Sequence, residues 1–355
     1  LKEIMEQPEA LRRAISPRIK DGRVIFDDLK LPVEKMREFT RIFIVACGSS
    51  YHVGMIGKYN LEHLLRRNVE VVLASEFRYS DPIVDDKSLV IVISQSGETL
   101  DTMAALREAK KRGGYILSIV NVVGSSIARE SDDVLYTWAG PEIAVATTKA
   151  YSTQMAVLDL LAVYLAAQRN TISAEEANRL TAAIAALPAQ VEQILSSREQ
   201  IQYYASQYFN HDSVFFIGRN LDYALGLEGS LKLKEISYIH SEAYAAGELK
   251  HGTISLMEEG TLVVALATQD ALYPKTVSNM IEVKTRGAFV MALSTKKHPD
   301  IEKYADYVLY IPETQNLFAG SLAIIPLQLF AYYVALMRGC DIDKPRNLAK
   351  SVTVE

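Results

Sequence analysis

Hydroxyl side chains gather around a glycine at residues 94–99, which read Ser-Gln-Ser-Gly-Glu-Thr. The apolar run 89–93 before this stretch predicts a buried strand, and apolar residues at helical spacing predict a helix from Leu100 to Arg112. The first N–H groups of a helix lack partners within the helix, and the helix dipole attracts negative charge to that end. The stretch therefore predicts a cradle for an anion such as phosphate, with an ordinary helix cap at Ser96 or Thr99 as the alternative.

Three charged residues, Glu228, Lys232 and Glu235, follow one face of a predicted helix from about Ala224 to Tyr238. Most charged stripes of this kind are solvated ion-pair faces. Leucine and isoleucine side chains flank this one on several sides, so we expect part of it to be buried. Burial raises the pKa of carboxylates, and a buried carboxylate can therefore transfer protons near neutral pH.

A histidine and a lysine lie on segments whose local folding the sequence does not decide. His251 stands in a predicted loop between Gly247 and Gly252, where a single histidine is more often structural or exposed than catalytic. Lys350 belongs to the polar segment 343–355, and chain ends are often frayed. If that segment folds back into a site, the Lys350 amine can form a Schiff base with a carbonyl, provided that burial keeps part of it neutral.

Strands and helices alternate along the chain from Arg41 onward. The predicted strands span 42–47, 69–74, 89–93, 115–120 and 133–136. Their alternation with helices predicts right-handed βαβ crossovers and a parallel sheet. Residues 152–208 look mainly helical, are divided by Pro188, and would connect two domains. The first 30 residues predict an arm that packs on the first domain or on a partner subunit.

The two halves of the chain repeat one another weakly. Residues 45–48 correspond to 215–218, 89–93 to 262–266, 112–113 to 286–287 and 134–136 to 308–310, at offsets of 170 to 174 residues. Two homologous α/β halves related by a pseudo-two-fold are therefore expected. The halves differ at the cradle, because 267–270 reads Ala-Thr-Gln-Asp and lacks both serines and the glycine. A purely structural cap has little reason to differ in this way, so the repeat favours a phosphate site in the first half.

The composition excludes several classes of protein. The formal net charge is −5, and no block of basic residues predicts nucleic-acid binding. Cys47 and Cys340 are too few for a disulfide framework and too scattered for a metal site, which fits a reducing cytosol.

Glycine, polar residues and Pro326 interrupt the apolar run 317–337, so we expect a buried helix pair or one kinked helix there, not a membrane span. The sequence begins at Leu1 with no visible signal peptide and no initiator methionine, which suggests a fragment.

Five segments together carry a resemblance to a known family. They are 47–50 (Cys-Gly-Ser-Ser), 94–99, 234–240 (Lys-Glu-Ile-Ser-Tyr-Ile-His), 247–252 (Gly-Glu-Leu-Lys-His-Gly) and 344–355 (Lys-Pro-Arg-Asn-Leu-Ala-Lys-Ser-Val-Thr-Val-Glu). They resemble the synthase, or isomerase, part of the glutamine–fructose-6-phosphate aminotransferase (glucosamine-6-phosphate synthase) family, which is built of two SIS (sugar isomerase) domains. The cradle alone would indicate only the SIS superfamily, whereas segment 234–240 and the tail are specific to amino-sugar synthases. The resemblance covers essentially the whole chain.

The resemblance implies an α/β fold with two homologous SIS domains and a C-terminal tail. Each domain would be a flavodoxin-like, three-layer αβα arrangement around a parallel sheet. We expect an N-terminal arm at 1–32, SIS domain 1 with the phosphosugar-binding loop at 33–172, a helical connection at 173–204, SIS domain 2 at 205–342 and the tail at 343–355.

The resemblance also implies a hexose 6-phosphate substrate held by both halves. The residues that match phosphate-binding or sugar-lining positions are Ser50, Ser94, Gln95, Ser96, Thr99, Val145, Thr147 and Ala349. Glu235 matches the base that moves hydrogen between C1 and C2, and Lys232 matches a second lysine near it. His251 matches the ring-opening acid/base, which in this family comes from the neighbouring subunit and so implies a homodimer. Lys350 matches the lysine that forms a Schiff base with C2 of the ketose.

The sequence departs from the family pattern at two positions without losing a functional group. The family commonly has Thr where Ser49 stands and Ser where Thr147 stands, and each replacement retains a hydroxyl. No metal or pyridoxal cofactor is implied, because an iminium itself acidifies the C1–H bond. The family's N-terminal glutaminase domain, which releases ammonia from glutamine, has no counterpart in this chain. A cytoplasmic enzyme with no nucleic-acid or membrane partner is implied.

We therefore expect a chain that converts fructose 6-phosphate and ammonia to glucosamine 6-phosphate by ketose–aldose isomerisation, the first step of hexosamine biosynthesis. One alternative is a regulatory SIS module that binds a phosphosugar without converting it, and such a module would lack a reactive lysine. The other is a deglycase or phosphosugar isomerase of the same superfamily, which product analysis with and without ammonium would distinguish.

Overall fold

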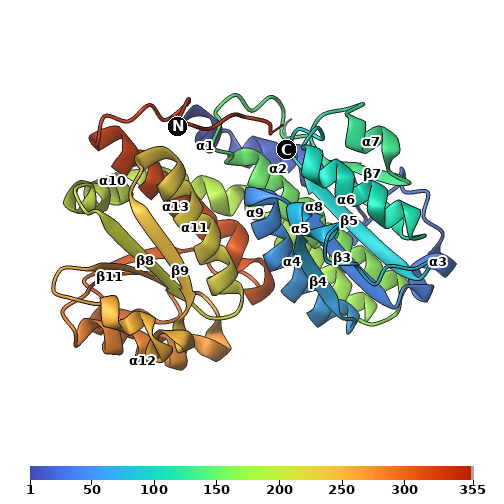
Figure 1. Cartoon of the computed structure of the whole chain (residues 1–355). Helices are drawn as coiled ribbons and strands as arrows, with labels where there is room; N and C mark the ends of the chain where they lie inside the picture. Colours follow the sequence, from blue (N-terminus) through green and yellow to red (C-terminus); the bar gives the residue numbers. More distant parts are fainter. Residues whose placement is uncertain (353–355) are drawn as a thin grey trace. The chain divides into compact units, whose positions relative to one another are not determined.

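The fold is that of a computed structural model, which describes residues 1–352 of the 355-residue chain (Figure 1). The last three residues of the predicted tail, 353–355, lie outside the described residues. The described chain divides into two compact units. The N-terminal unit contains residues 6–142, 147–188 and 349–352, and the C-terminal unit contains 1–5, 143–146 and 189–348.

A five-stranded parallel sheet forms the centre of the N-terminal unit. Its strands are β3 (Arg41–Ala46), β4 (Val69–Leu73), β5 (Ser88–Ser94), β6 (Tyr115–Val120) and β7 (Asp133–Tyr136), in the order β4-β3-β5-β6-β7. These bounds confirm the five predicted strands to within one residue. All seven residues of β5 are buried, as expected for a central parallel strand that helices cover on both faces.

Helices cover both faces of this sheet (Figure 1). One face carries α5 (Ala74–Phe77), α6 (Leu100–Lys111) and α7 (Ser126–Glu130), and the other carries α4 (Gly48–Leu65) and α8 (Lys149–Gln168). Short elements precede them: α2 (Gln7–Ile15), β1 (Ile19–Lys20), β2 (Arg23–Val24) and α3 (Val33–Glu38). The α2 helix packs on α8, where Ser152 Oγ donates a 2.5 Å hydrogen bond to the buried Gln7 Oε1.

The C-terminal unit has a second five-stranded parallel sheet. Its strands are β8 (Ser213–Gly218), β9 (His240–Ala245), β10 (Leu262–Ala267), β11 (Phe289–Thr295) and β12 (Tyr307–Ile311), in the order β12-β11-β10-β8-β9. The helices α11 (Leu221–Ser237) and α13 (Ala319–Met337) pack together on one face, α10 (Arg198–Tyr208) packs on α13, and α12 (Tyr273–Lys284) covers the other face. Counted in chain order, both sheets have the strand order 2-1-3-4-5 of a flavodoxin-like fold.

Shared details confirm the internal repeat. The Asp132 carboxylate accepts the Ile116 N–H at 2.8 Å, and the Asp306 carboxylate accepts the Val290 N–H at 2.9 Å. Each pair lies 16 residues apart, between the same two strands of its sheet. These hydrogen bonds join a loop to a strand in the same way in both halves, as expected for duplicated domains.

One part of the predicted alignment is wrong by two residues. Residues 89–93 correspond to 262–266, so Val92 corresponds to Ala265. Val45 pairs with Val92 in the first sheet, and Ile217 pairs with Ala265 in the second. Ile217 therefore corresponds to Val45. The error arises because Gly218 and Gly48 were equated although they occupy different places. Gly218 ends a strand, whereas Gly48 begins a helix.

Two prolines lie inside helices. The predicted division of the helical region at Pro188 is wrong for secondary structure, since α9 (Ala174–Ser196) continues through this residue. Proline removes one backbone N–H donor, and the burial of Pro188 indicates that packing compensates for that loss. Residues 319–337 form the single helix α13 around Pro326, which excludes a helix pair.

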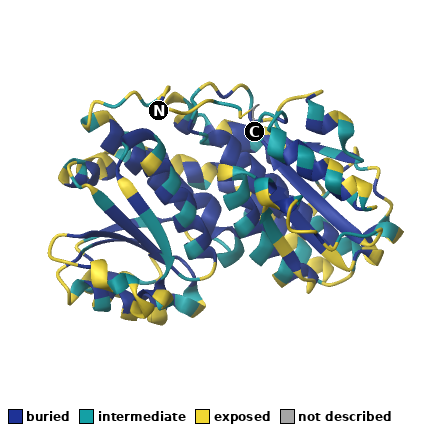
Figure 2. Cartoon of the chain, in the orientation of Figure 1, coloured by how far each residue is buried: buried dark blue, intermediate teal, exposed yellow. Residues whose placement is uncertain are grey.

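Two helical segments, Lys149–Gln168 and Asn316–Met337, are long and apolar enough to cross a membrane, but 89% of each apolar window is buried inside the protein. Figure 2 shows the buried strands and these core helices in dark blue. Their composition is therefore accounted for by the cores of the two units.

Candidate functional site

The predicted cradle lies at the carboxyl ends of neighbouring strands β3 and β5. In this strand order the chain leaves β3 and β5 toward opposite faces of the sheet, and ligands of open α/β sheets bind at such a point. Ser50 stands in the first turn of α4, directly after β3. Residues 94–99 connect β5 to α6. Topology therefore places Ser50 and the cradle at the same edge of the sheet.

The cradle is shaped by hydrogen bonds within the loop. The Gly97 N–H donates to Ser94 Oγ at 3.0 Å, and the Glu98 N–H donates to Ser96 Oγ at 3.2 Å. Thr99 holds the N-cap position of α6, but its side chain does not cap the helix and lies 3.3 Å from Ser94 Oγ. An ordinary Thr99 cap is therefore not formed, and the hydroxyl side chains gather beside the first turn of α6.

Gly97 has φ of +67°, the left-handed region that disfavours side chains. A Cβ atom here would lie 2.1 Å from Ser125 Oγ, just before α7. Two further contacts fix the loop to α7, because the Glu98 carboxylate accepts the Ser126 N–H at 2.8 Å and the Gly97 carbonyl accepts the Ile127 N–H at 3.0 Å. The Ser126 hydrogen bond lowers the pKa of Glu98 below its usual range.

The tail returns to the N-terminal unit and carries Lys350 with it. The Val352 carbonyl accepts the N–H of Leu100, the first residue of α6, at 3.3 Å. Lys350 Nζ lies 2.6 Å from Glu142 Oε2, and the lysine side chain is 25% exposed. The tail therefore folds back onto the unit that holds the cradle, as the expected role of Lys350 requires.

Glu142 contacts two of the predicted site residues, and the sequence analysis did not single it out. Its side chain is fully buried, and its Oε2 accepts from Thr147 Oγ1 at 2.7 Å as well as from Lys350. Gln154 was missed too: its buried side-chain carbonyl accepts from Ser50 Oγ at 3.1 Å. A carboxylate a few residues before the start of α8 was a weak signal for Glu142, since acidic groups favour helix N-termini.

The remaining predicted sugar-lining residues are divided between the units. Ala349 is exposed and precedes Lys350 in the N-terminal unit. Val145 belongs to the C-terminal unit, where its N–H donates to the Asp343 carbonyl at 3.1 Å. Gln95, also in the N-terminal unit, accepts the Asn121 N–H with its backbone carbonyl at 3.2 Å, which leaves its side chain out of that contact.

The charged stripe of α11 is largely buried in the C-terminal unit. Lys232 Nζ lies 2.5 Å from Glu235 Oε2 and 3.4 Å from Glu228 Oε1. The Lys232 and Glu228 side chains are 2% and 0% exposed, whereas that of Glu235 is 21% exposed. A solvated ion-pair face is thereby excluded, and Glu235 is the member of the stripe that can meet a bound molecule.

His251 also belongs to the C-terminal unit and ends the 3₁₀ helix η2 (Ala246–His251). It is exposed, and Gly252 follows with φ of +155°. The structure thus brings Lys232 and Glu235 together and leaves His251 open to solvent.

An internal carboxylate occupies the corresponding loop of the second half. With Ile217 aligned to Val45, Asp222 in α11 corresponds to Ser50 in α4. Asp222 Oδ2 accepts the Thr268 N–H at 2.8 Å, and Oδ1 accepts from Thr268 Oγ1 at 2.5 Å. Burial raises the pKa of Asp222 to about 6, although the hydrogen bonds from Thr268 oppose that rise. In the second half, a carboxylate of the chain itself is therefore hydrogen-bonded to the loop that corresponds to the cradle.

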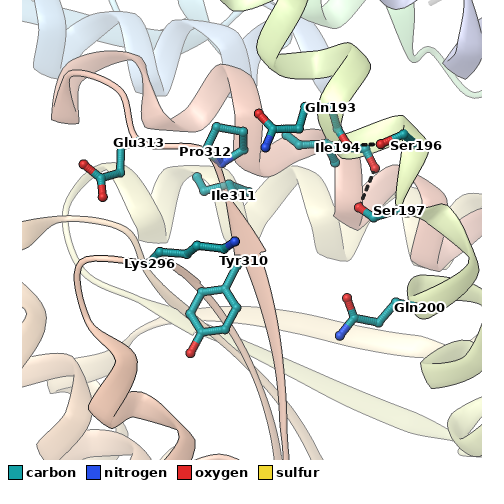
Figure 3. A pocket seen from close by; sticks show the side chains of 10 residues that line it. All are labelled: Gln193, Ile194, Ser196, Ser197, Gln200, Lys296, Tyr310, Ile311, Pro312 and Glu313. Carbon is teal, nitrogen blue, oxygen red and sulfur yellow. Dashed lines mark hydrogen bonds between the residues drawn. The ribbon is translucent and has the colours of Figure 1, made fainter.

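A surface cavity of about 620 Å³ lies elsewhere in the C-terminal unit (Figure 3). It is lined by the end of α9, the start of α10 and the ends of β11 and β12. Figure 3 shows that the Ser196 and Ser197 hydroxyls are turned to backbone carbonyls, those of Gln193 and Ile194. None of the predicted site residues lines this cavity. Within residues 1–352, no group of three or more His, Cys, Asp or Glu side chains could hold a metal ion.

Comparisons with known proteins agree with this geometry. The family model described as SIS domain matches residues 35–164 and 207–338. Glutamine--fructose-6-phosphate aminotransferase [isomerizing] from Clostridium tetani is 55% identical over the whole of this chain and 59% of its own length. The Thermus thermophilus protein of that name is 47% identical over the whole chain and 58% of its own length. The chain therefore spans less than two thirds of these curated relatives.

Solved structures agree as well. The C-terminal domain of glucosamine-fructose-6-phosphate aminotransferase from Francisella tularensis superimposes with a TM-score of 0.94 and 39% identity, covering 97% of both chains. A glucosamine-6-phosphate deaminase from Thermotoga maritima superimposes with a TM-score of 0.76 and 25% identity, covering 99% of this chain and 98% of the other.

Proposed function

The chain belongs to the SIS domain family, in the group formed by the C-terminal domains of these aminotransferases, and we propose that it converts fructose 6-phosphate to glucosamine 6-phosphate. One observation carries the proposal furthest. The tail holds Lys350 in the same unit as the cradle and binds the first residue of the helix that follows the cradle. An anion site beside an amine is what a Schiff-base reaction on a phosphorylated ketose requires.

We assign substrate binding to the cradle and its surroundings. The phosphate is bound by Ser94, Gln95, Ser96 and Thr99 together with the N–H groups at the start of α6. Ser50, Val145, Thr147 and Ala349 line the sugar. Family membership supports this set, and the position of residues 94–99 at the switch point of the first sheet supports its phosphate-binding part.

The proposed reaction proceeds through an iminium on Lys350. His251 assists opening of the sugar ring, the Lys350 amine attacks C2, and water leaves. Ammonia then displaces the lysine, and Glu235 moves a proton from C1 to C2 to give glucosamine 6-phosphate. Lys232 is the cation beside that base. The burial of Lys232 beside Glu235 supports these two roles, while family membership supports that of His251.

We infer a partner for nitrogen delivery from the length of the relatives. They extend well beyond the region this chain matches, and a glutaminase domain would supply ammonia from glutamine there. The chain itself would use free ammonia or isomerise the sugar to glucose 6-phosphate. We further propose a cytoplasmic homodimer in which His251 serves the neighbouring subunit.

The test is chemical trapping. Borohydride added to the 355-residue chain with fructose 6-phosphate is expected to reduce the iminium and fix the sugar covalently to Lys350, as read by peptide mass spectrometry. The Lys350→Ala variant should show no adduct. Labelling of another residue, or no labelling in the unaltered chain, would remove Lys350 from the mechanism.

A second candidate has a specific observation in its favour. The similarity to the deaminase from Thermotoga maritima extends over nearly the whole of both chains. In this second candidate function, the chain is a deglycase or isomerase of phosphosugars. Product analysis decides between them. A synthase forms glucosamine 6-phosphate from fructose 6-phosphate when ammonium is added, whereas an isomerase forms none. A deaminase, whose reaction is the reverse of that synthesis, is recognised by net release of ammonia from glucosamine 6-phosphate.

A further inference from the structure

The Glu142 carboxylate is held by four hydrogen-bond donors. Its Oε1 accepts the N–H groups of Thr148 at 2.9 Å and Ala150 at 3.1 Å. Its Oε2 accepts from Thr147 Oγ1 at 2.7 Å and from Lys350 Nζ at 2.6 Å. A carboxylate with four acceptor positions filled in this way has no freedom to turn.

The start of α8 supplies two of these donors. Thr148 is the N-cap of α8 and Ala150 lies in its first turn, so Glu142 takes two N–H groups that the helix cannot use itself. The helix dipole favours a negative charge at this end. Because the Glu142 side chain is fully buried and that of Lys350 is only 25% exposed, their attraction is screened less than that of a surface pair.

Two other charged groups of the N-terminal unit have their own partners. Lys149 Nζ, which is buried, lies 2.7 Å from Glu6 Oε2 on the arm. Glu98 in the cradle loop accepts the Ser126 N–H at the start of α7. Glu142 meets Lys350 directly, at a separation of 208 residues in the chain.

We propose that Glu142 is the fixed counter-ion of Lys350. This rests on the proposed function, in which Lys350 forms an iminium with C2 of the sugar. The iminium nitrogen carries a positive charge. A carboxylate already placed 2.6 Å from that nitrogen stabilises the iminium without reorganising. Glu142 is therefore a positioning residue that acts through Lys350 and not on the sugar itself.

Two variants at this position separate charge from shape. Glu142→Gln keeps the length and one acceptor oxygen for α8 but loses the charge, whereas Glu142→Asp keeps the charge on a shorter side chain. Borohydride trapping with saturating fructose 6-phosphate measures the iminium. Binding of glucitol 6-phosphate, which has the phosphate but no carbonyl, measures the cradle. Glu6→Gln is the matched control, since it removes a carboxylate at the same helix start while its amide oxygen still accepts from Lys149.

The amount of trapped adduct should be greatest for the unaltered chain, smaller for Glu142→Asp and smallest for Glu142→Gln, which should fall by about tenfold or more. The affinity for glucitol 6-phosphate should stay unchanged within about twofold. The Glu6→Gln control should trap like the unaltered chain. Undiminished trapping in Glu142→Gln overturns the proposal. It is also overturned if both Glu142 variants lose glucitol 6-phosphate affinity together with trapping, because the carboxylate then serves only the fold. Absence of a Lys350 adduct in the unaltered chain would instead defeat the proposed function.

Discussion

Asp222 should make the stability of the protein depend on pH in an unusual direction. Burial raises the pKa of this carboxyl to about 6 in the folded chain, above the ordinary value of 3.8. The unfolded state therefore loses its proton first as the pH rises from about 4 to 6, and the free energy of unfolding falls over that window by about 3 kcal/mol. Below about pH 4 the full contribution is present, and above about pH 6 it is lost.

The free energy of unfolding by urea, measured at pH 4, 5, 6 and 7 for the unaltered chain and for Asp222→Asn, tests this pH dependence. The amide cannot ionise, so the stability gap between the two proteins should change with pH, with the unaltered chain losing stability relative to Asp222→Asn as the pH rises through the window. Burial also raises the pKa of Asp159, to about 8, which affects both proteins alike and cancels in the comparison. A gap that stays constant from pH 4 to 7 would contradict the assignment to Asp222.

Sequence reasoning at the residue scale succeeded where the signal was local. The hydroxyls of 94–99 lie within six residues of one another, and their position between a strand and a helix is visible in the sequence. Glu142 and Gln154 gained their roles from contacts with Lys350 and Ser50 that span 208 and 104 residues. A single sequence carries no record of such pairs, because only folding brings them together.

At the scale of elements, the turn between β5 and α6 depends on Gly97. Gly97→Ala should lower the affinity for glucitol 6-phosphate by about tenfold or more, because the new Cβ would collide with Ser125 and push the loop away from α7. Titration calorimetry measures that affinity, and circular dichroism checks that the sheet remains folded.

Gly124→Ala is the matched control for Gly97→Ala. Gly124 has nearly the same backbone conformation, with φ of +69°, but an added Cβ would meet no atom within 4 Å. It should lose about 1 kcal/mol of stability from backbone strain and keep its sugar-phosphate affinity. Equal losses of affinity in both variants would mean that left-handed strain, and not the contact with Ser125, governs the loop.

The strands of the first sheet were predictable from their sequence. Most of their residues are apolar and polar turns separate them, so their ends could be read to within one residue. Pro188 misled the interpretation because a proline usually ends a helix, whereas here its buried side chain lies within α9. The equation of Gly48 with Gly218 failed because a glycine marks a turn without saying on which side of it the strand ends.

At the scale of the whole molecule, the proposed homodimer makes a prediction about mixing. Co-expressed His251→Asn and Lys350→Ala chains should together recover about a quarter of the unaltered activity, since half of the random dimers are mixed and each has one complete site. Glucosamine 6-phosphate formation with ammonium measures the recovery, and each variant expressed alone is the control. No recovery would place His251 and Lys350 of the same subunit in one site.

When a domain is duplicated, its binding site is ordinarily duplicated too. In the second half of this chain, however, the Asp222 carboxylate is bound by the loop that corresponds to the cradle. A carboxylate attached to the fold and buried against Thr268 competes with dissolved phosphate at a far higher effective concentration. The two halves share an architecture, and we expect only the first to bind a sugar phosphate. Saturation should be reached at one sugar phosphate per chain, with the duplicated cradle acting as scaffold.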